Sequence, residues 1–589
     1  MKPRRFRSSD WFDDREHIDL MALYLERFMN YGLTPEELRS GKPIIGIAQS
    51  GSDLTPCNRI HVELAKRVRD GIRDAGGIPM EFPTHPIFEN CRRPTAALDR
   101  NLAYLGLVEI LHGYPIDGVV LTTGCDKTTP SAIMAASTVD IPAIVLSGGP
   151  MLDGWFEDEL VGSGTVIWKS RRRLAAGTIT EEEFIDAAAA SAPSPGHCNT
   201  MGTASTMNAV AEVLGLSLPG CSAIPAPYRE RAQMAYLTGK RIVEMANEDL
   251  KPSRVLTRES FLNAITAIAA IGGSTNAQPH LTAMARHAGF DLTAKDWIDY
   301  GRDIPLIVNM QPAGKYLGER FHRAGGVPAV VCELINAGKL HPDVLTVTGK
   351  TLRENVAGRE TRDREMITHY AEPLRKDAGF VVLHGNLFDF AIMKASVITE
   401  EFRKRYLCAE GHDNVFDARA IVFDGSDDYR HRINDPALAI DERCVLVIRG
   451  AGPLGWPGSA EVVNMQPPDA LLQRGITSLP TIGDGRQSGT SDSPSILNAS
   501  PESAAGGGLA WVRTGDTIRI DLGQGRCDML VPEAEIERRK GDGIPAVPAS
   551  ATPWQELYRA TVSQLDRGGV MEMALKYRRV AEKTPRHNH

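Results

Sequence analysis

Long apolar runs and a secretory leader are both missing from this 589-residue chain. No stretch is long and uncharged enough to read as a membrane span. The basic residues at positions 2–7 are followed by Asp10, Asp13 and Asp14, where a secretory signal would have its apolar segment. We therefore expect a cytoplasmic protein without a membrane partner.

An excess of positive charge is also missing. The formal net charge is -8, and a nucleic-acid or anionic-membrane partner would require a basic face. No repeat of fixed period is visible. With 42% hydrophobic and 24% charged residues, the composition is that of a globular protein whose expected partners are small molecules.

The nine cysteines show no paired spacing. None forms a C-x-x-C pair, which argues against a disulfide framework and against a zinc finger. A zinc hydrolase is disfavoured as well, because no H-E-x-x-H motif is present. In a reducing cytosol these cysteines are expected to be thiols or metal ligands.

The most informative stretch runs from residue 116 to residue 134. An apolar run, 119–121, leads into a Thr-Thr-Gly turn and then into Cys125, Asp126 and Lys127. Thr129 and Pro130 suit the N-cap and first position of a helix. The pattern predicts strand, turn and helix, with the three polar residues at the carboxyl end of the strand, where α/β sheets place their ligand sites.

Two other cysteines share this context. Residues 43–48 read as a buried strand, and Cys57 follows in the loop before a predicted helix over 59–75. Cys198 lies in a polar loop just before a predicted helix over 206–214. Strands are also expected at 78–82 and 143–146, and their alternation with helices predicts an α/β domain with a parallel sheet.

The pattern of predicted secondary structure changes near residue 379. Short β-type runs follow at 380–383, 418–423 and 444–448, and a hairpin is expected between 516–521 and 527–531. We predict an α/β domain over residues 1–378 and a mostly β, barrel-like domain over 379–589 that ends in a helical tail. Glycine-rich loops at 449–461 and 483–493 would let the backbone approach a ligand closely.

Two of these motifs carry a family resemblance. Cys125-Asp-Lys-Thr-Thr-Pro130 and Gly483-Asp-Gly-Arg-Gln-Ser488-Gly resemble the signatures of the dihydroxyacid/phosphogluconate dehydratases, the IlvD/Edd family. The opening at 7–12 and the run 58–61 resemble its sugar-acid branch. The resemblance implies a dehydratase that acts on an aldonate, with D-xylonate expected and L-arabinonate, D-gluconate or a branched-chain dihydroxy acid as alternatives. It also implies a homo-oligomer, a dimer of dimers.

The resemblance assigns the cofactors. It implies an iron–sulfur cluster on Cys57, Cys125 and Cys198, with [2Fe-2S] expected in the sugar-acid branch, although three cysteines would equally suit a [4Fe-4S] cluster with one open iron. A single cysteine is more often a small buried hydrophobe. The shared context of these three residues favours ligands.

A magnesium site is implied as well. The family pattern points to Glu89, Asp126 and Glu461, with Lys127 as a fourth ligand. A protonated lysine has no lone pair for a cation, so the resemblance implies a carbamylated Lys127 that supplies oxygen. The alternative is an ordinary salt bridge from Lys127, and Glu461 taken alone would read as a surface acid.

The resemblance makes Ser488 the base that takes the C2 proton. A free hydroxyl is too weak for this role, but metal binding can depress the pKa of an oxygen acid from about 15.7 to about 7, as it does for water. The alternative is that Ser488 only forms hydrogen bonds in its turn. Gln487 and Thr490 are candidate substrate contacts, and Gln487 stands where many members carry an apolar residue.

A non-enzymatic iron–sulfur redox sensor is the hypothesis from a different class. It would account for the three cysteines but would leave Ser488, Glu461 and the magnesium ligands without a role. An electron carrier of the ferredoxin kind would also be expected to ligate every iron fully. Assays for iron, sulfide and zinc distinguish the enzyme, the sensor and a zinc hydrolase.

Overall fold

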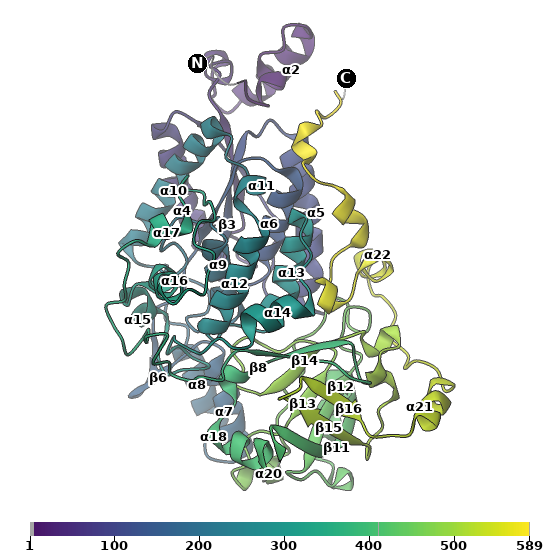
Figure 1. Ribbon diagram of the computed structural model, residues 1–589. Helices are drawn as coiled ribbons and strands as arrows, with labels where there is room; N and C mark the ends of the chain where they lie inside the picture. The colour runs from purple at the N-terminus through teal and green to yellow at the C-terminus, as the bar shows by residue number, and fades with distance from the viewer. Residues whose placement is uncertain (1–4, 410–411, 588–589) are drawn as a thin grey trace.

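The computed structural model describes residues 5–409 and 412–587 of the chain. Figure 1 shows a helix-rich half that holds the N-terminal sequence and a strand-rich half packed beneath it. Within the described residues, no helix combines the length and the apolar character needed to cross a bilayer.

The first half is built on a four-stranded parallel sheet. Its strands are β1 (Ile44–Gln49), β2 (Ile78–Pro83), β3 (Gly118–Thr123) and β4 (Ala143–Ser147), in the order β2-β1-β3-β4. β3 and β4 are buried along their whole length, as expected for a parallel sheet with helices on both faces. The predicted α/β architecture is confirmed.

Helices cover both faces of this sheet. The helices α4 (His61–Asp74) and α10 (Arg229–Glu248) pack on one side, while α5 (Ala96–Gly113) and α6 (Thr128–Val139) pack on the other (Figure 1). Further helices, including α9 (Thr203–Val213), α12 (Arg258–Ala270) and α13 (Ala277–Ala288), extend the same core. The segment that precedes α9 carries Cys198.

The start of α6 differs from the prediction. The helix begins at Thr128, with Lys127 at the N-cap position, and not at Pro130 after a Thr129 cap. The reason is local, because the Thr128 hydroxyl donates to the carbonyl of Cys125 at 2.7 Å and so closes the first turn earlier. Pro130 is accommodated because the first turn of a helix has no need of its N–H.

The second half contains an eight-stranded mixed sheet, ordered β16-β15-β11-β12-β13-β14-β8-β7. The strands are β7 (Phe380–Leu383), β8 (Phe390–Lys394), β11 (Val415–Asp424), β12 (Cys444–Arg449), β13 (Thr481–Gly483), β14 (Ser495–Ser500), β15 (Thr517–Asp521) and β16 (Arg526–Met529). Strands β11 to β14 run parallel, and the outer strands pair antiparallel.

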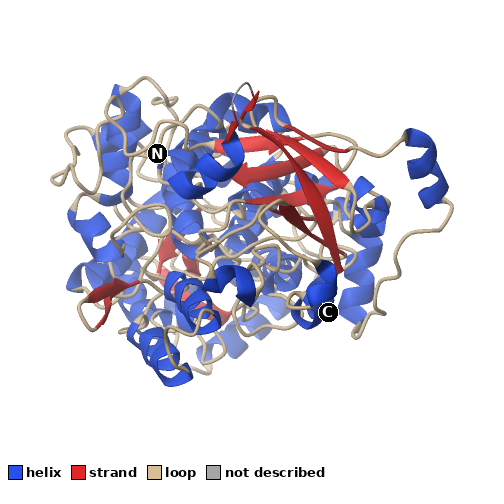
Figure 2. Ribbon diagram, turned by 90° about the horizontal axis from the view of Figure 1, so that it is seen from below, coloured by secondary structure: helices blue, strands red, loops and turns tan. Residues whose placement is uncertain are grey.

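This sheet curves until its edges nearly meet (Figure 2). His384, just beyond β7, forms a bridge with Arg526 of β16. Its N–H donates to the carbonyl of Gly525 at 2.9 Å, and its carbonyl accepts from the N–H of Cys527 at 2.9 Å. The predicted mostly β, barrel-like second half is therefore confirmed, and the 516–531 hairpin is β15–β16. The boundary at 378/379 stays a prediction.

The C-terminal tail returns to the first half. After α21 (Glu533–Lys540) and α22 (Pro553–Thr561), the chain runs along α5 and α13 (Figure 1). The buried side chains of Val570, Met571 and Ala574 belong to the core of the first half. Arg100 of α5 donates to the carbonyls of Gly568 and Gly569 at 2.7 and 2.6 Å. The tail thus completes the α/β core.

Candidate active site

The parallel sheet brings two of the predicted cysteines together. β1 and β3 are neighbours, so the loops at their carboxyl ends lie side by side. The first loop carries Cys57 and the second carries Cys125. They are joined directly, because the N–H of Cys125 donates to the side-chain oxygen of Asn58 at 2.6 Å. Asn208 of α9 fixes the same turn by donating to the carbonyl of Gly124 at 3.0 Å.

Cys198 completes a group of three thiols. Cys57, Cys125 and Cys198 all line one cavity of about 850 Å³ between the two halves. The Ser163 hydroxyl donates to the Cys198 sulfur at 3.4 Å. The other cysteines lie outside this cavity lining: Cys91, Cys221, Cys332, Cys408, Cys444 and Cys527.

The surroundings of Cys125 and Cys198 disfavour their thiolate forms. The hydrogen bond that the Cys125 S–H donates to Cys57, together with burial, raises the pKa of the Cys125 thiol well above its usual value. Burial, together with the charge of Cys57, raises the pKa of Cys198 to about 12. A metal centre would supply the charge that deprotonates such thiols, because a coordinating thiol loses its proton to the metal's own charge.

Three carboxylates form a second group in the same cavity. One oxygen from each of Glu89, Asp126 and Glu461 lies within 4.8 Å of the others. Lys127 reaches into this group, with its Nζ 2.7 Å from Glu89, 2.9 Å from Asp126 and 3.7 Å from Glu461. The structure therefore brings together all four residues predicted for magnesium, and in the unmodified chain they form an ion-pair cluster.

A second buried cation supports these acids. Arg486, which is 1% exposed, donates to Glu461 at 2.9 Å and to Glu89 at 3.2 Å. Burial raises the pKa of Glu89, but the charges of Lys127 and Arg486 outweigh it and bring the pKa to about 2. For Glu461, burial and the charge of Glu89 raise the pKa to about 7. Crowded carboxylates of this kind are typical of a divalent-cation site.

Ser488 lies in the loop between β13 and β14. Its hydroxyl is 2.8 Å from the hydroxyl of Thr490, and both residues line the cavity. Gly489 between them packs tightly: an added Cβ would lie 2.5 Å from the N–H nitrogen of Thr203 and 2.7 Å from the Ser274 hydroxyl. A glycine is required there for the loop to reach the cavity.

Gln487 is placed differently from the other candidates. Its side chain is 1% exposed, donates to the carbonyl of Ser493 at 3.4 Å and does not belong to the cavity lining. Its predicted contact with substrate is therefore not supported by the geometry, whereas Thr490 is in position to touch a ligand.

Three residues of the site were not singled out from the sequence. Asn276 donates to Glu461 at 2.5 Å and to the carbonyl of Gln487 at 3.0 Å. Trp168 donates to Thr490 at 3.0 Å. Lys394 donates to the carbonyl of Gly489 at 3.3 Å. No local motif marks Trp168 or Lys394.

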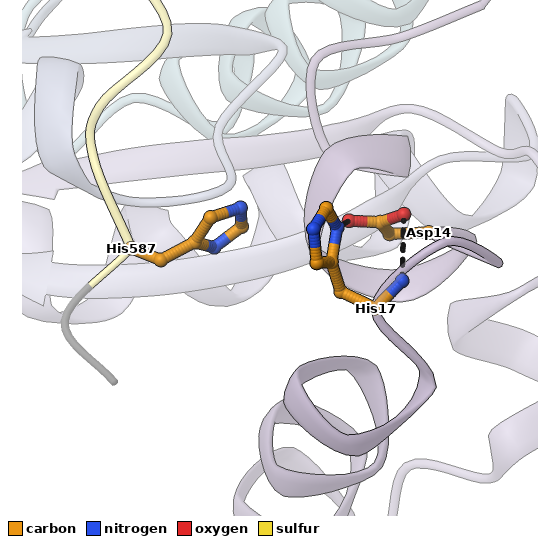
Figure 3. A group of neighbouring side chains, drawn as sticks. All are labelled: Asp14, His17 and His587. Atoms are coloured by element: carbon orange, nitrogen blue, oxygen red, sulfur yellow. Dashed lines mark hydrogen bonds and ion pairs between the residues drawn. The ribbon is translucent and has the colours of Figure 1, made fainter.

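Another possible ligand group lies where the chain ends meet. Asp14, His17 and His587 are neighbours (Figure 3), and His17 Nδ1 is 2.9 Å from Asp14. His17 and His587 are exposed, and none of the three lines the 850 Å³ cavity. This group is separate from the site described above.

The donors fit both cofactors implied by the sequence. Three thiols leave one position of an iron–sulfur cluster for substrate, and three carboxylates supply the hard oxygen ligands that Mg²⁺ prefers. If Lys127 lost its positive charge, the negative charges of the three carboxylates would be only partly neutralised. A bound cation could then supply the missing positive charge. Ser488, the three thiols and the three carboxylates all line one cavity between an α/β half and a barrel-like half.

Fold and site together define a class of dehydratases. Residues 42–355 match the family model for the N-terminal part of the dihydroxy-acid/6-phosphogluconate dehydratases, and residues 365–569 match the model for the C-terminal part. The chain belongs to this family.

Particular relatives are close. The chain is 78% identical over 587 residues to D-xylonate dehydratase of Caulobacter vibrioides, covering 100% of this chain and 98% of the relative. It is 43% identical to L-arabinonate dehydratase of Rhizobium leguminosarum bv. trifolii, covering 97% and 96%. Identity to the dihydroxy-acid dehydratase of Caldanaerobacter subterraneus subsp. tengcongensis is 37%, covering 92% and 95%.

Proposed function

We propose that this protein is a hydro-lyase that removes water from a sugar acid, converting D-xylonate to 2-dehydro-3-deoxy-D-pentonate. The observation that carries the proposal is the single cavity in which three thiols, three carboxylates and Ser488 meet. Dehydration of a 2,3-dihydroxy acid needs a base at C2 and an electrophile for the hydroxyl at C3. The candidate base Ser488 and the residues that would hold the electrophilic cofactors line this cavity. The full-length similarity to a D-xylonate dehydratase supports the choice of substrate.

The cofactor ligands are part of the proposal. Cys57, Cys125 and Cys198 would hold a [2Fe-2S] cluster in preference to [4Fe-4S]. Glu89, Asp126 and Glu461, with a carbamylated Lys127, would hold Mg²⁺. When bound, these groups supply Lewis acidity toward the C3 hydroxyl and positive charge toward the substrate carboxylate.

Ser488 is proposed as the base. Ser488 lines the same cavity as the carboxylates, so a substrate bound to them would lie within this cavity with its C2 hydrogen open to the Ser488 hydroxyl. Thr490, 2.8 Å away, would hold Ser488 in orientation. Arg486 would keep Glu461 and Glu89 ionised for ligand binding, because its guanidinium contacts both.

The assembly and compartment also belong to the proposal. We expect a homotetramer, a dimer of dimers, in the cytoplasm. Light scattering on the purified protein measures the subunit number directly, and a monomer at micromolar concentration would contradict this part without touching the proposed reaction.

A substrate panel tests the function. Purified protein with its cluster is given D-xylonate, L-arabinonate, D-gluconate and a branched-chain 2,3-dihydroxy acid, and formation of a 2-keto acid is measured. We expect the highest kcat/KM for D-xylonate. Turnover confined to the branched-chain acid would refute the sugar-acid assignment. Iron and sulfide without turnover of any substrate would favour the redox-sensor alternative.

A further inference from the structure

Ser488 Oγ lies at the end of two chains of hydrogen-bond donors. The first chain starts at the indole of Trp168 in α7 (Thr165–Ala175), whose Nε1–H donates to Thr490 Oγ1 at 3.0 Å. Thr490 Oγ1 is in turn 2.8 Å from Ser488 Oγ. An indole can only donate, so its bond uses an acceptor site of the Thr490 hydroxyl and leaves the Thr490 proton to point at Ser488.

The second chain starts at a buried ammonium group. Lys394, at the end of β8 and 2% exposed, donates from Nζ to the carbonyl of Gly489 at 3.3 Å. That carbonyl and the N–H of Thr490 belong to the same peptide unit, and the N–H donates to Ser488 Oγ at 3.4 Å. A cation on the carbonyl side polarises the peptide and strengthens its N–H as a donor.

The charge of Lys394 has no evident structural use. Burial lowers its pKa to about 8, with the charge of Asp492 opposing this change, so the group is still largely protonated at neutral pH. Asp492 is itself bound by Arg172 at 2.8 and 2.7 Å. Among the described residues, Lys394 thus has no carboxylate of its own, and burying a charge in this way is costly to the fold.

Both series of hydrogen bonds run in the same direction, with donors directed toward Ser488 Oγ. Lys394 and Trp168 have donors and no acceptors, and a deprotonated Ser488 has acceptors and no donor. We propose that Lys394 and Trp168 are positioning residues that stabilise the deprotonated form of Ser488, acting through the Gly489–Thr490 peptide and the Thr490 hydroxyl. This inference rests on the proposed role of Ser488 as the base. Donors preorganised around a developing oxyanion are an established source of rate enhancement.

The test replaces each terminal donor. Lys394→Met removes the charge, and Trp168→Phe keeps an aromatic ring but removes the N–H. Matched controls are Lys169→Met, 53% exposed, and Trp155→Phe, 59% exposed. Exchange of the C2 proton of D-xylonate with deuterated solvent is measured at saturating substrate, along with kcat, KM, iron content and melting temperature.

Both variants should slow C2 exchange and kcat by about tenfold, less than the 10²–10³ lost with a direct oxyanion donor, because each acts through an intermediate group. The alkaline-rising limb of the rate profile should move up by about one pH unit for each tenfold loss. KM should stay near wild type in Lys394→Met, since Lys394 does not line the cavity. Iron content should be unchanged, and melting temperature equal or higher, because a buried charge has been removed.

Three outcomes would overturn the inference or its basis. If both variants exchange the C2 proton at the wild-type rate while Ser488→Ala is inactive, Lys394 and Trp168 do not assist Ser488. The proposed role of Ser488 as the base would be unaffected. Parallel losses of activity, iron and melting temperature mean that Lys394 and Trp168 are structural, which also refutes the inference. Wild-type exchange in Ser488→Ala removes the base itself and is a failure of the proposed function. Adding Lys394→Met to Ser488→Ala should give no further loss.

Discussion

Arg486→Met is expected to lower the free energy of unfolding, because it removes a cation that compensates the charges of Glu89 and Glu461. In the native chain the Arg486 guanidinium contacts Glu461 at 2.9 Å, Glu89 at 3.2 Å and the carbonyl of Ser459 at 3.0 Å, all in the protein interior. Methionine fills similar space without the charge. Among the residues that the structure describes, Lys127 is then the one cationic partner left to these carboxylates.

The magnitude follows from which contacts survive. Removing one partner of a buried ion pair costs about 3–5 kcal/mol. Glu89 keeps its 2.7 Å contact with Lys127, whereas Glu461 is left with a cation 3.7 Å away. We therefore expect a loss at the lower end, about 3 kcal/mol, carried mainly by Glu461.

The loss should depend on pH. Burial and Glu89 already raise the pKa of Glu461 from 4.5 to about 7, and loss of Arg486 raises it further. An acid with a raised pKa in the folded state binds protons more tightly there than in the unfolded chain, so stability falls as pH rises through that range. The loss of stability of Arg486→Met relative to the wild type should be small near pH 5 and largest above pH 8.

Urea midpoints of cofactor-free protein at the two pH values provide the measurement. The matched control is Arg443→Met, since Arg443 is 85% exposed and pairs with Asp441 at 2.7 Å. Exposed ion pairs contribute about 0–1 kcal/mol, so the urea midpoint of this variant should stay close to that of the wild type. Equal losses in the two variants, or a loss in Arg486→Met that is the same at both pH values, would refute the reasoning.

Three further predictions address the cofactors and the tail. Cys198→Ser should abolish the visible iron–sulfur absorption and activity together while Cys332→Ser keeps both, and a normal cluster spectrum in the first variant would contradict the ligand assignment. Glu461→Gln should weaken Mg²⁺ binding in a titration of chelated protein, since it removes one of three clustered carboxylates; unchanged affinity would exclude Glu461 as a ligand. Met571→Ala should destabilise the fold by about 2–5 kcal/mol because this side chain is 1% exposed, and a urea midpoint like wild type would show that the tail is dispensable.

Much of the first half could be predicted because its signals are local. An apolar run followed by a glycine turn marks the end of β3, and that end carries Cys125. The start of α6 was misplaced by two residues because the hydroxyl bond of Thr128 to Cys125 is not visible in a propensity pattern.

The part of the site around Gly489 depends on pairing between segments that are distant in the sequence. Lys394 ends an apolar strand and reads as an ordinary polar terminus; only the antiparallel pairing of β8 with β14 sets it behind Gly489. Gln487 and Ser488 are adjacent in sequence, yet one faces the interior and the other the cavity. Sequence motifs indicate which loop carries chemistry, but not which side chain of that loop faces the substrate.

The returning tail has a consequence for biosynthesis. Arg100 bonds to the carbonyl of Gly569, a residue 469 positions later, and Val570 is fully buried in the core that also contains Ile45 and Ile47 of β1. A ribosome completes the strands of the parallel sheet long before it supplies the segment that closes their helical layer. Contacts so distant in sequence form late and slowly. The nascent first half must therefore wait, with an apolar surface uncovered, until residues 569–574 have been synthesised.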